Sequence, residues 1–170
     1  MKAYTNVNLV TCDSEFHVYR DGLLVVEDDR LAYCGAYDEA WLEQCSELVD
    51  YEGAWLMPGL VNCHTHSAMT LLRGIRDDSN LHEWLGDYIW PAESQFTADV
   101  TTKAVQLALA EMLQSGTTTF NDMYNPQGVE IDRIYQVVRQ SGMRCYFSPT
   151  LFSSEAETAE ETLARTRGII

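Results

Sequence analysis

The sequence predicts an α/β protein, with a strand-rich segment over residues 1–55 and alternating strands and helices over residues 56–170. Short runs rich in β-branched and aromatic residues fill the first segment. In the second, apolar runs alternate with stretches whose apolar residues recur at helical period. The 170 residues are 46% hydrophobic, with only 10 Gly and 4 Pro, which excludes a disordered tail or a low-complexity linker.

The first segment is predicted to contain several short strands and one short helix. Its β-rich runs end at turn residues such as Asp28-Asp29, which lead from one run into the next. The predicted strands are Val7–Thr11, Phe16–Tyr19, Leu23–Glu27, Arg30–Cys34 and Leu48–Tyr51, and the predicted helix is Asp38–Cys45.

The second segment opens with the apolar run Leu56–Cys63, which is typical of a strand buried on both faces. Ser67–Gly74 and Leu81–Ile89 are predicted to form helical turns. The clearest helix is Ala98–Gln114, and Gly116 is placed to end it. The apolar stripe of that helix consists of Ala104, Val105, Ala108, Leu109, Met112 and Leu113.

Two further strands and two further helices follow. Thr117–Phe120 and Arg144–Phe147 are strand-like, and between them lies a helix that stops near Gly142. Ser154 and Glu157 form a capping box for a third helix. Such alternation favours parallel strands with right-handed crossovers, in a barrel or an open sheet. The inward side chains of the helix before Gly142 are Ile131, Ile134, Tyr135 and Val138.

Charge and cysteine content exclude several classes of partner. Eleven basic against 26 acidic residues give a net charge of −15, which repels nucleic acid and anionic membrane surfaces. Residues 54–72 lack charged residues, but two imidazoles in this stretch argue against a membrane helix. Five scattered cysteines, with no CxxC pair and no secretory signal, predict reduced thiols and a cytoplasmic location.

The most informative motif is the histidine pair His64 and His66, directly after the apolar run and Pro58-Gly59. Side chains two apart on a strand face the same way, so both imidazoles could bind one metal ion at the strand's carboxyl end. Exposed loop histidines or a satisfied polar cluster are the alternatives. The same alternation places Cys63 on the opposite face, as a small buried residue. The two remaining histidines, His17 and His82, are predicted to be surface residues.

Three stretches resemble the amidohydrolase superfamily, in its branch of 5′-methylthioadenosine/S-adenosylhomocysteine deaminases. They are PGLVNCHTHSAMTLLRG (58–74), LHEWLGDYIWPAE (81–93) and LAEMLQSGTTTFNDMY (109–124). The resemblance implies that residues 1–55 are a β-sandwich portion. It implies that residues 56–170 are the first three βα units of a metal-dependent (β/α)8 TIM barrel. A complete barrel of this kind takes about 250 residues, so we expect an N-terminal part of a longer, truncated enzyme.

The resemblance also assigns site residues. His64 and His66 would be two of four protein ligands of one divalent metal, most often Zn²⁺. Trp84 would pack against the bound nucleoside and Glu93 would hold the ribose hydroxyls. Spacing alone favours a core role for Trp84 and a solvated acid at Glu93. Asp122 is expected near the site and no more. The other ligands and the proton-transfer residues are expected beyond Ile170, so no catalytic residue is assigned here.

The implied reaction is the hydrolytic deamination of an adenine nucleoside such as 5′-methylthioadenosine or S-adenosylhomocysteine. A metal-activated hydroxide attacks C6 and ammonia leaves. The alternatives are another amidohydrolase, of the guanine deaminase or triazine chlorohydrolase type, or a non-catalytic binding fragment. We expect the 170-residue chain alone to be inactive. The sequence leaves open the preferred nucleoside, the metal identity and whether the protein is a homo-oligomer.

Overall fold

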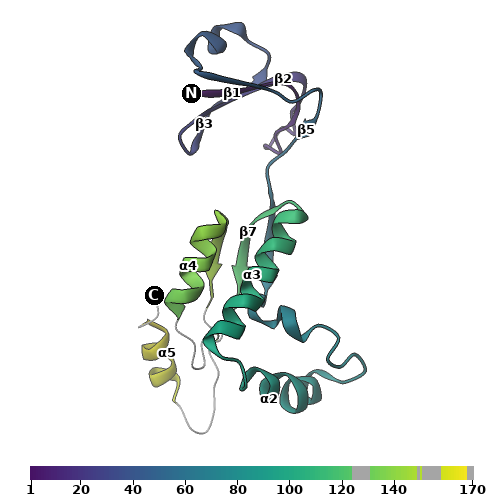
Figure 1. Ribbon diagram of the computed structural model, residues 1–170, viewed down its shortest axis with the longest axis vertical. Helices are drawn as coiled ribbons and strands as arrows, with labels where there is room; N and C mark the ends of the chain where they lie inside the picture. The colour runs from purple at the N-terminus through teal and green to yellow at the C-terminus, as the bar shows by residue number, and fades with distance from the viewer. Residues whose placement is uncertain (124–130, 149, 151–157, 168–170) are drawn as a thin grey trace. The chain divides into compact units, whose positions relative to one another are not determined.

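The computed structural model describes residues 1–123, 131–148, 150 and 158–167. The chain forms two compact units, Met1–Pro58 and Gly59–Ile170. The described part of the first unit consists of strands and one short helix, and that of the second consists of parallel strands with helices (Figure 1). The chain is therefore of the α/β class, as predicted.

The first unit is one mixed sheet with the strand order β3-β2-β1-β4, and β5 also pairs with β1. The β1–β2 and β2–β3 pairs are antiparallel, whereas β4 and β5 run parallel to β1. The elements are β1 (Lys2–Val10), β2 (Val18–Glu27), β3 (Arg30–Ala36), the 3-10 helix η1 (Glu39–Gln44), β4 (Glu47–Asp50) and β5 (Trp55–Leu56).

The small core of the first unit forms on one face of this sheet. Ala3 of β1 pairs with Val25 of β2, and both side chains are fully buried together with Leu23. Trp41 and Leu42 of η1 pack against them, and Asp38 caps that helix by accepting a hydrogen bond from the amide of Ala40. The short helix predicted in this region is confirmed. It covers the apolar face that the alternating strand residues leave on the sheet.

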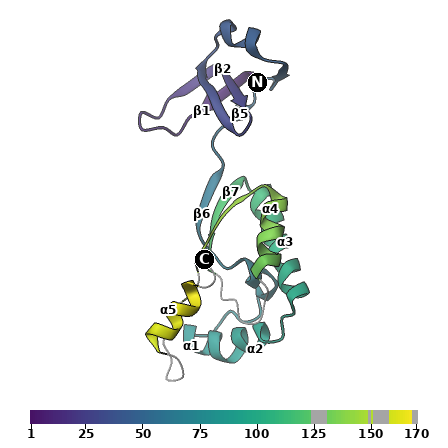
Figure 2. The ribbon, with the colours of Figure 1, turned by 90° about the vertical axis from the view of Figure 1, so that its left-hand side faces the viewer.

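The second unit contains the parallel strands β6 (Leu60–Thr65), β7 (Thr117–Asp122) and β8 (Arg144–Phe147), in the order β6-β7-β8. The predicted parallel pairing is thus confirmed. Helices α3 (Ala98–Gln114) and α4 (Ile131–Ser141) pack side by side on this sheet (Figure 2). The other helical segments are η2 (Ser67–Leu72), α1 (Leu81–Glu83), the π-helix η3 (Trp84–Ile89), α2 (Trp90–Glu93) and α5 (Ala159–Arg167).

Phe120 of β7 is the largest fully buried side chain of the second unit. It packs with Val105 and Leu109 of α3 and with Ile134 of α4. The predicted apolar stripe of α3 is therefore confirmed for its central residues, whereas Leu113, at the end of the helix, is 45% exposed. Gly116 follows the last turn at φ 82°, which a glycine adopts without steric cost, and confirms the predicted end of α3.

The prediction of one strand from Leu56 to Cys63, buried on both faces, is wrong. Leu56 ends the short strand β5, which pairs with β1 in the first unit, and β6 begins only after Pro58 and Gly59. Leu60 and Val61 are 51% and 63% exposed. The physical reason is that β6 pairs only with β7 among the described strands, so it forms an edge of the sheet.

Ser154 and Glu157, the capping box predicted for the third helix, lie outside the described residues. The described helix α5 carries the same motif a few residues later. The Thr158 hydroxyl accepts from the Glu161 amide at 3.2 Å, and the Glu161 carboxylate accepts from the Thr158 amide at 2.8 Å. Within the part of the chain that the structure describes, no helix is long and apolar enough to span a membrane.

Candidate active site

His64 and His66 lie at the carboxyl end of β6, where parallel strands of α/β proteins hold their functional groups. Their ring centroids are 5.0 Å apart and the ring planes stand nearly perpendicular, at 88°. Both side chains are exposed. The structure therefore brings together the two histidines that the sequence singles out.

The strand β6 contains a β-bulge next to this histidine pair. Asn62 pairs with Phe120 and Thr65 pairs with Asp122, so β6 uses one residue more than β7 over this stretch. The extra residue changes the alternation of side chains along β6. Cys63 is exposed, as His64 is, so the prediction that it is buried opposite His64 is wrong. Simple strand alternation could not show this, because the bulge has no signature in the sequence.

The ring of His66 is held by the neighbouring strand. Its Nδ1 lies 3.0 Å from the carbonyl oxygen of Met123, the residue that follows β7. A carbonyl can only accept, so Nδ1 carries a proton, and when the ring is neutral its lone pair lies on Nε2. Such a carbonyl bond to one ring nitrogen is typical of histidines whose other nitrogen binds a metal. The donor chemistry therefore fits a zinc ligand.

Asp122, at the end of β7, is the buried acid beside the histidine pair. Its carboxylate is 1% exposed and accepts hydrogen bonds from the amide of Ser67, at 2.9 Å, and from the Ser67 hydroxyl. Burial raises the pKa of Asp122, while the bonds from Ser67 and the charge of His66 oppose that rise. The sequence placed Asp122 near the site but missed Ser67, whose only signal is its position directly after His66.

Glu93 lies in α2 and is half-buried. Burial raises the pKa of its carboxyl, and the charge of His66 opposes the shift. Glu93 is therefore an electrostatic neighbour of His66, although it lies 27 positions further along the chain. The sequence alone would have left Glu93 as an ordinary solvated acid.

Trp84 is half-buried at the start of the π-helix η3. In a regular α-helix, residues nine positions apart such as Trp84 and Glu93 lie about half a turn out of phase. The wider π turns of η3 rotate less per residue, so this phase difference is smaller here. Trp84 also lines an open surface depression together with Arg76, Asp77, Ser79 and Leu81.

The two imidazoles do not complete a metal site by themselves. Among the described residues, no third His, Cys, Asp or Glu lies near enough to form a group of three metal-binding side chains. Both oxygens of Asp122 already accept hydrogen bonds from Ser67. The described residues thus offer two candidate nitrogen donors, whereas a zinc ion in a protein takes about four ligands.

The sequence of this chain is similar to that of known amidohydrolases. The sequence profile of the Amidohydrolase family matches residues 55–169. A 5-methylthioadenosine/S-adenosylhomocysteine deaminase of Bacillus cytotoxicus is 47% identical over 151 residues, which are 89% of this chain and 35% of the relative. A protein of the same name from Bacillus anthracis is 44% identical over 158 residues, 93% of this chain and 36% of the relative. The chain thus spans about a third of the length of the curated relatives it matches.

Solved structures show the same fold. An adenosine deaminase from Xanthomonas campestris with bound zinc aligns with a TM-score of 0.73 at 30% identity, over 99% of this chain and 38% of that one. The zinc complex of the atrazine chlorohydrolase TrzN from Arthrobacter aurescens aligns with a TM-score of 0.80 at 19% identity, covering 99% and 42% of the two chains. A guanine deaminase from C. acetobutylicum reaches 0.79 at 21%, with the same coverage.

Proposed function

The chain belongs to the amidohydrolase family, and we propose that it is the N-terminal part of a metal-dependent deaminase of adenine nucleosides. In this proposal Met1–Pro58 is the β-sandwich portion, and Gly59–Ile170 is the first part of a (β/α)8 TIM barrel with three βα units. The 44–47% identity to proteins named 5-methylthioadenosine/S-adenosylhomocysteine deaminase supports the branch.

The observation that carries the proposal is the orientation of His64 and His66. Two imidazoles stand together at a strand end, and the Met123 carbonyl fixes the tautomer of His66 that leaves Nε2 for a metal. We assign both histidines as ligands of one divalent metal, Zn²⁺, because imidazole nitrogens suit that ion. When bound, such an ion supplies Lewis-acid activation of water at neutral pH.

In the proposed reaction, water and an adenine nucleoside give the 6-oxo purine nucleoside and ammonia. Glu93 accepts hydrogen bonds from the ribose hydroxyls, and because its carboxylate lies within electrostatic range of His66, this holds the sugar near the histidine pair. Trp84 provides an aromatic wall for the bound nucleoside. The described residues do not supply the remaining metal ligands, and no proton-transfer residue is assigned in this chain, which spans about a third of the length of its relatives.

The proposal includes the partners and the compartment. The net charge of −15 suits a small neutral or zwitterionic substrate and disfavours nucleic acid and membranes. All five cysteines are free thiols, which fits the proposed cytoplasmic location. Association into a homo-oligomer stays open.

The decisive experiment measures ammonia release by the intact protein from 5′-methylthioadenosine and from the free base adenine. We expect turnover of the nucleoside. Glu93→Gln should lower kcat/KM for the nucleoside about 10- to 100-fold, because a charge-assisted hydrogen bond is lost. Activity on any free base should not change. The matched control is Glu39→Gln, in the exposed helix η1 of the first unit.

Two outcomes would contradict the proposal. If the intact protein releases ammonia from guanine or hydrolyses a chlorotriazine but leaves adenine nucleosides untouched, the chain belongs to another branch of the family. If Glu93→Gln and Glu39→Gln behave alike on the nucleoside, Glu93 does not bind ribose.

A further inference from the structure

Asp122 is a buried carboxylate that the proposed reaction does not use. It is 1% exposed, at the carboxyl end of β7, and lies within electrostatic range of His66. A buried charged group is costly unless hydrogen bonds satisfy it. Both of its oxygens are satisfied by a single residue, Ser67, through the backbone amide and the hydroxyl.

Ser67 is the first residue of η2, directly after His66. The first amides of a helix have no partner inside the helix, and a side chain at the preceding position usually accepts one. Here the preceding residue is His66, which makes no such capping bond. Asp122, on the neighbouring strand, accepts instead from the first amide of η2, that of Ser67.

The end of β7 therefore holds His66 at two points. Asp122 fixes the backbone on its C-terminal side through Ser67, and Met123 fixes the ring through Nδ1. Met123 is itself anchored, since its amide donates to the carbonyl of Thr65 at 2.9 Å. The amide of Ser148 donates to the carbonyl of Asp122 at 2.9 Å, which ties the end of β7 to the residue after β8.

We propose that Asp122 is a positioning residue for His66. By accepting the hydrogen bonds of the Ser67 amide and hydroxyl, Asp122 holds the backbone next to His66 and thereby keeps the imidazole in one orientation and one tautomer. We assign Asp122 no metal-binding role, because it forms no group of three metal-binding side chains with the histidine pair among the described residues. The metal-binding part of this inference rests on the proposed function, whereas the orientation of the ring does not. Residues of this kind, which orient a ligand, typically change metal affinity about 10- to 100-fold.

The first test uses the intact protein, with its metal removed and its histidines labelled with ¹⁵N. The ring signal of His66 is identified by its absence in His66→Ala. We expect wild type to show one tautomer, with the proton on Nδ1. Asp122→Ala should show both tautomers or an averaged signal, and Ser67→Ala should show a smaller change of the same kind, because it keeps the backbone bond to Asp122. The matched control Asp99→Asn, an exposed acid at the start of α3, should leave the signal unchanged.

The second test measures the zinc affinity of the same variants by competition with a chelator. We expect Asp122→Ala to weaken zinc binding about 10- to 100-fold. Asp122→Asn should weaken it less, because the amide oxygen still accepts the bond from the Ser67 amide. Asp99→Asn should bind as wild type does.

The two tests separate the possible failures. A single Nδ1-protonated tautomer in folded Asp122→Ala, with zinc affinity within twofold of wild type, would overturn the inference. If Asp122→Ala does not fold, Asp122→Asn and Ser67→Ala decide by the same criteria. If instead His66→Ala keeps the zinc affinity of wild type, the proposed metal site is wrong, and the ring signal alone then decides the role of Asp122.

Discussion

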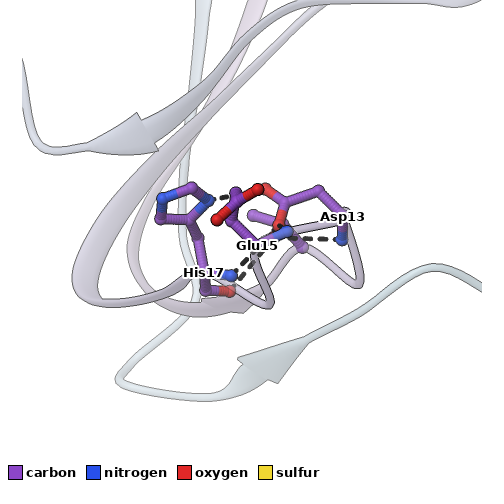
Figure 3. Close-up of polar contacts among 4 residues, drawn as sticks. Asp13, Glu15 and His17 are labelled. Carbon is purple, nitrogen blue, oxygen red and sulfur yellow. Dashed lines mark hydrogen bonds and ion pairs between the residues drawn. The ribbon is translucent and has the colours of Figure 1, made fainter.

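Two aspartates of this chain lie beside a histidine, in opposite surroundings. Asp13, in the first unit, accepts from the amides of Glu15 and His17 and contacts the His17 ring at 2.8 Å, in an exposed loop before β2 (Figure 3). Asp122, in the second unit, is buried. The side-chain hydrogen bond from His17 holds the pKa of Asp13 well below its usual range, whereas burial raises the pKa of Asp122.

The difference shows how burial decides what a carboxylate does. In the exposed loop water competes for every bond, so the pair closes a turn and contributes little else. The carboxylate of Asp122 is buried at the end of β7, where leaving it without a hydrogen-bond donor would cost more free energy. The buried carboxylate therefore fixes the conformation of its neighbours, and His66 is one of them.

The largest contrast is expected from the same substitution made in each region. Phe120→Ala empties a fully buried position between the sheet and helices α3 and α4, and should destabilise the protein by about 3–5 kcal/mol. Phe16→Ala removes a ring that is 79% exposed in the Asp13 loop and should change stability by less than about 0.5 kcal/mol. Denaturant unfolding of both variants measures the contrast, and equal losses would refute it.

An intermediate effect is expected at Gly59, just before β6. A Cβ there would lie 2.1 Å from the Thr118 hydroxyl oxygen, so Gly59→Ala should cost about 1–3 kcal/mol. Thr118→Gly should restore much of that loss, because it removes the clashing atoms. The control Gly86→Ala has nothing within 4 Å and should be neutral or slightly stabilising. Thermal unfolding of all four variants, the double one included, tests this.

The smallest effect is expected at Asp13. Its lowered pKa means that its carboxylate favours the folded state above the ordinary value of 3.8, and that this contribution is lost as the pH falls below that value. Asp13→Asn should therefore lower the melting temperature slightly at pH 7. The gap from wild type should shrink steadily below pH 3.8. A gap that widens on acidification would show that Asp13 has another role.

Periodicity predicted the parts of the fold whose causes are local. The stripe of α3, its end at Gly116 and the strand–helix alternation all follow from residues close in sequence. The prediction for Leu56–Cys63 failed because an apolar run does not reveal that Leu56 pairs with β1 whereas residues 60–62 pair with β7. That division depends on pairings between residues far apart in the sequence.

The candidate site was predictable in part for the same reason. His64 and His66 stand two positions apart, so their proximity follows from the strand itself. The contacts that orient them join residues 55 or more positions apart, from Ser67 to Asp122 and from His66 to Met123. The bulge between Asn62 and Thr65 is likewise set by the register between β6 and β7. Hydrophobic patterning carries none of this information.

The most direct test of the account is the zinc content of the intact protein after dialysis, for wild type and three histidine variants. The central claim is that His64 and His66 bind one metal ion together. We expect about one zinc per chain in wild type, a strong loss in His64→Ala and in His66→Ala, and no loss in His17→Ala, whose ring contacts only the Asp13 loop and Tyr19 among the described residues. Full zinc content in either His64→Ala or His66→Ala would contradict the claim.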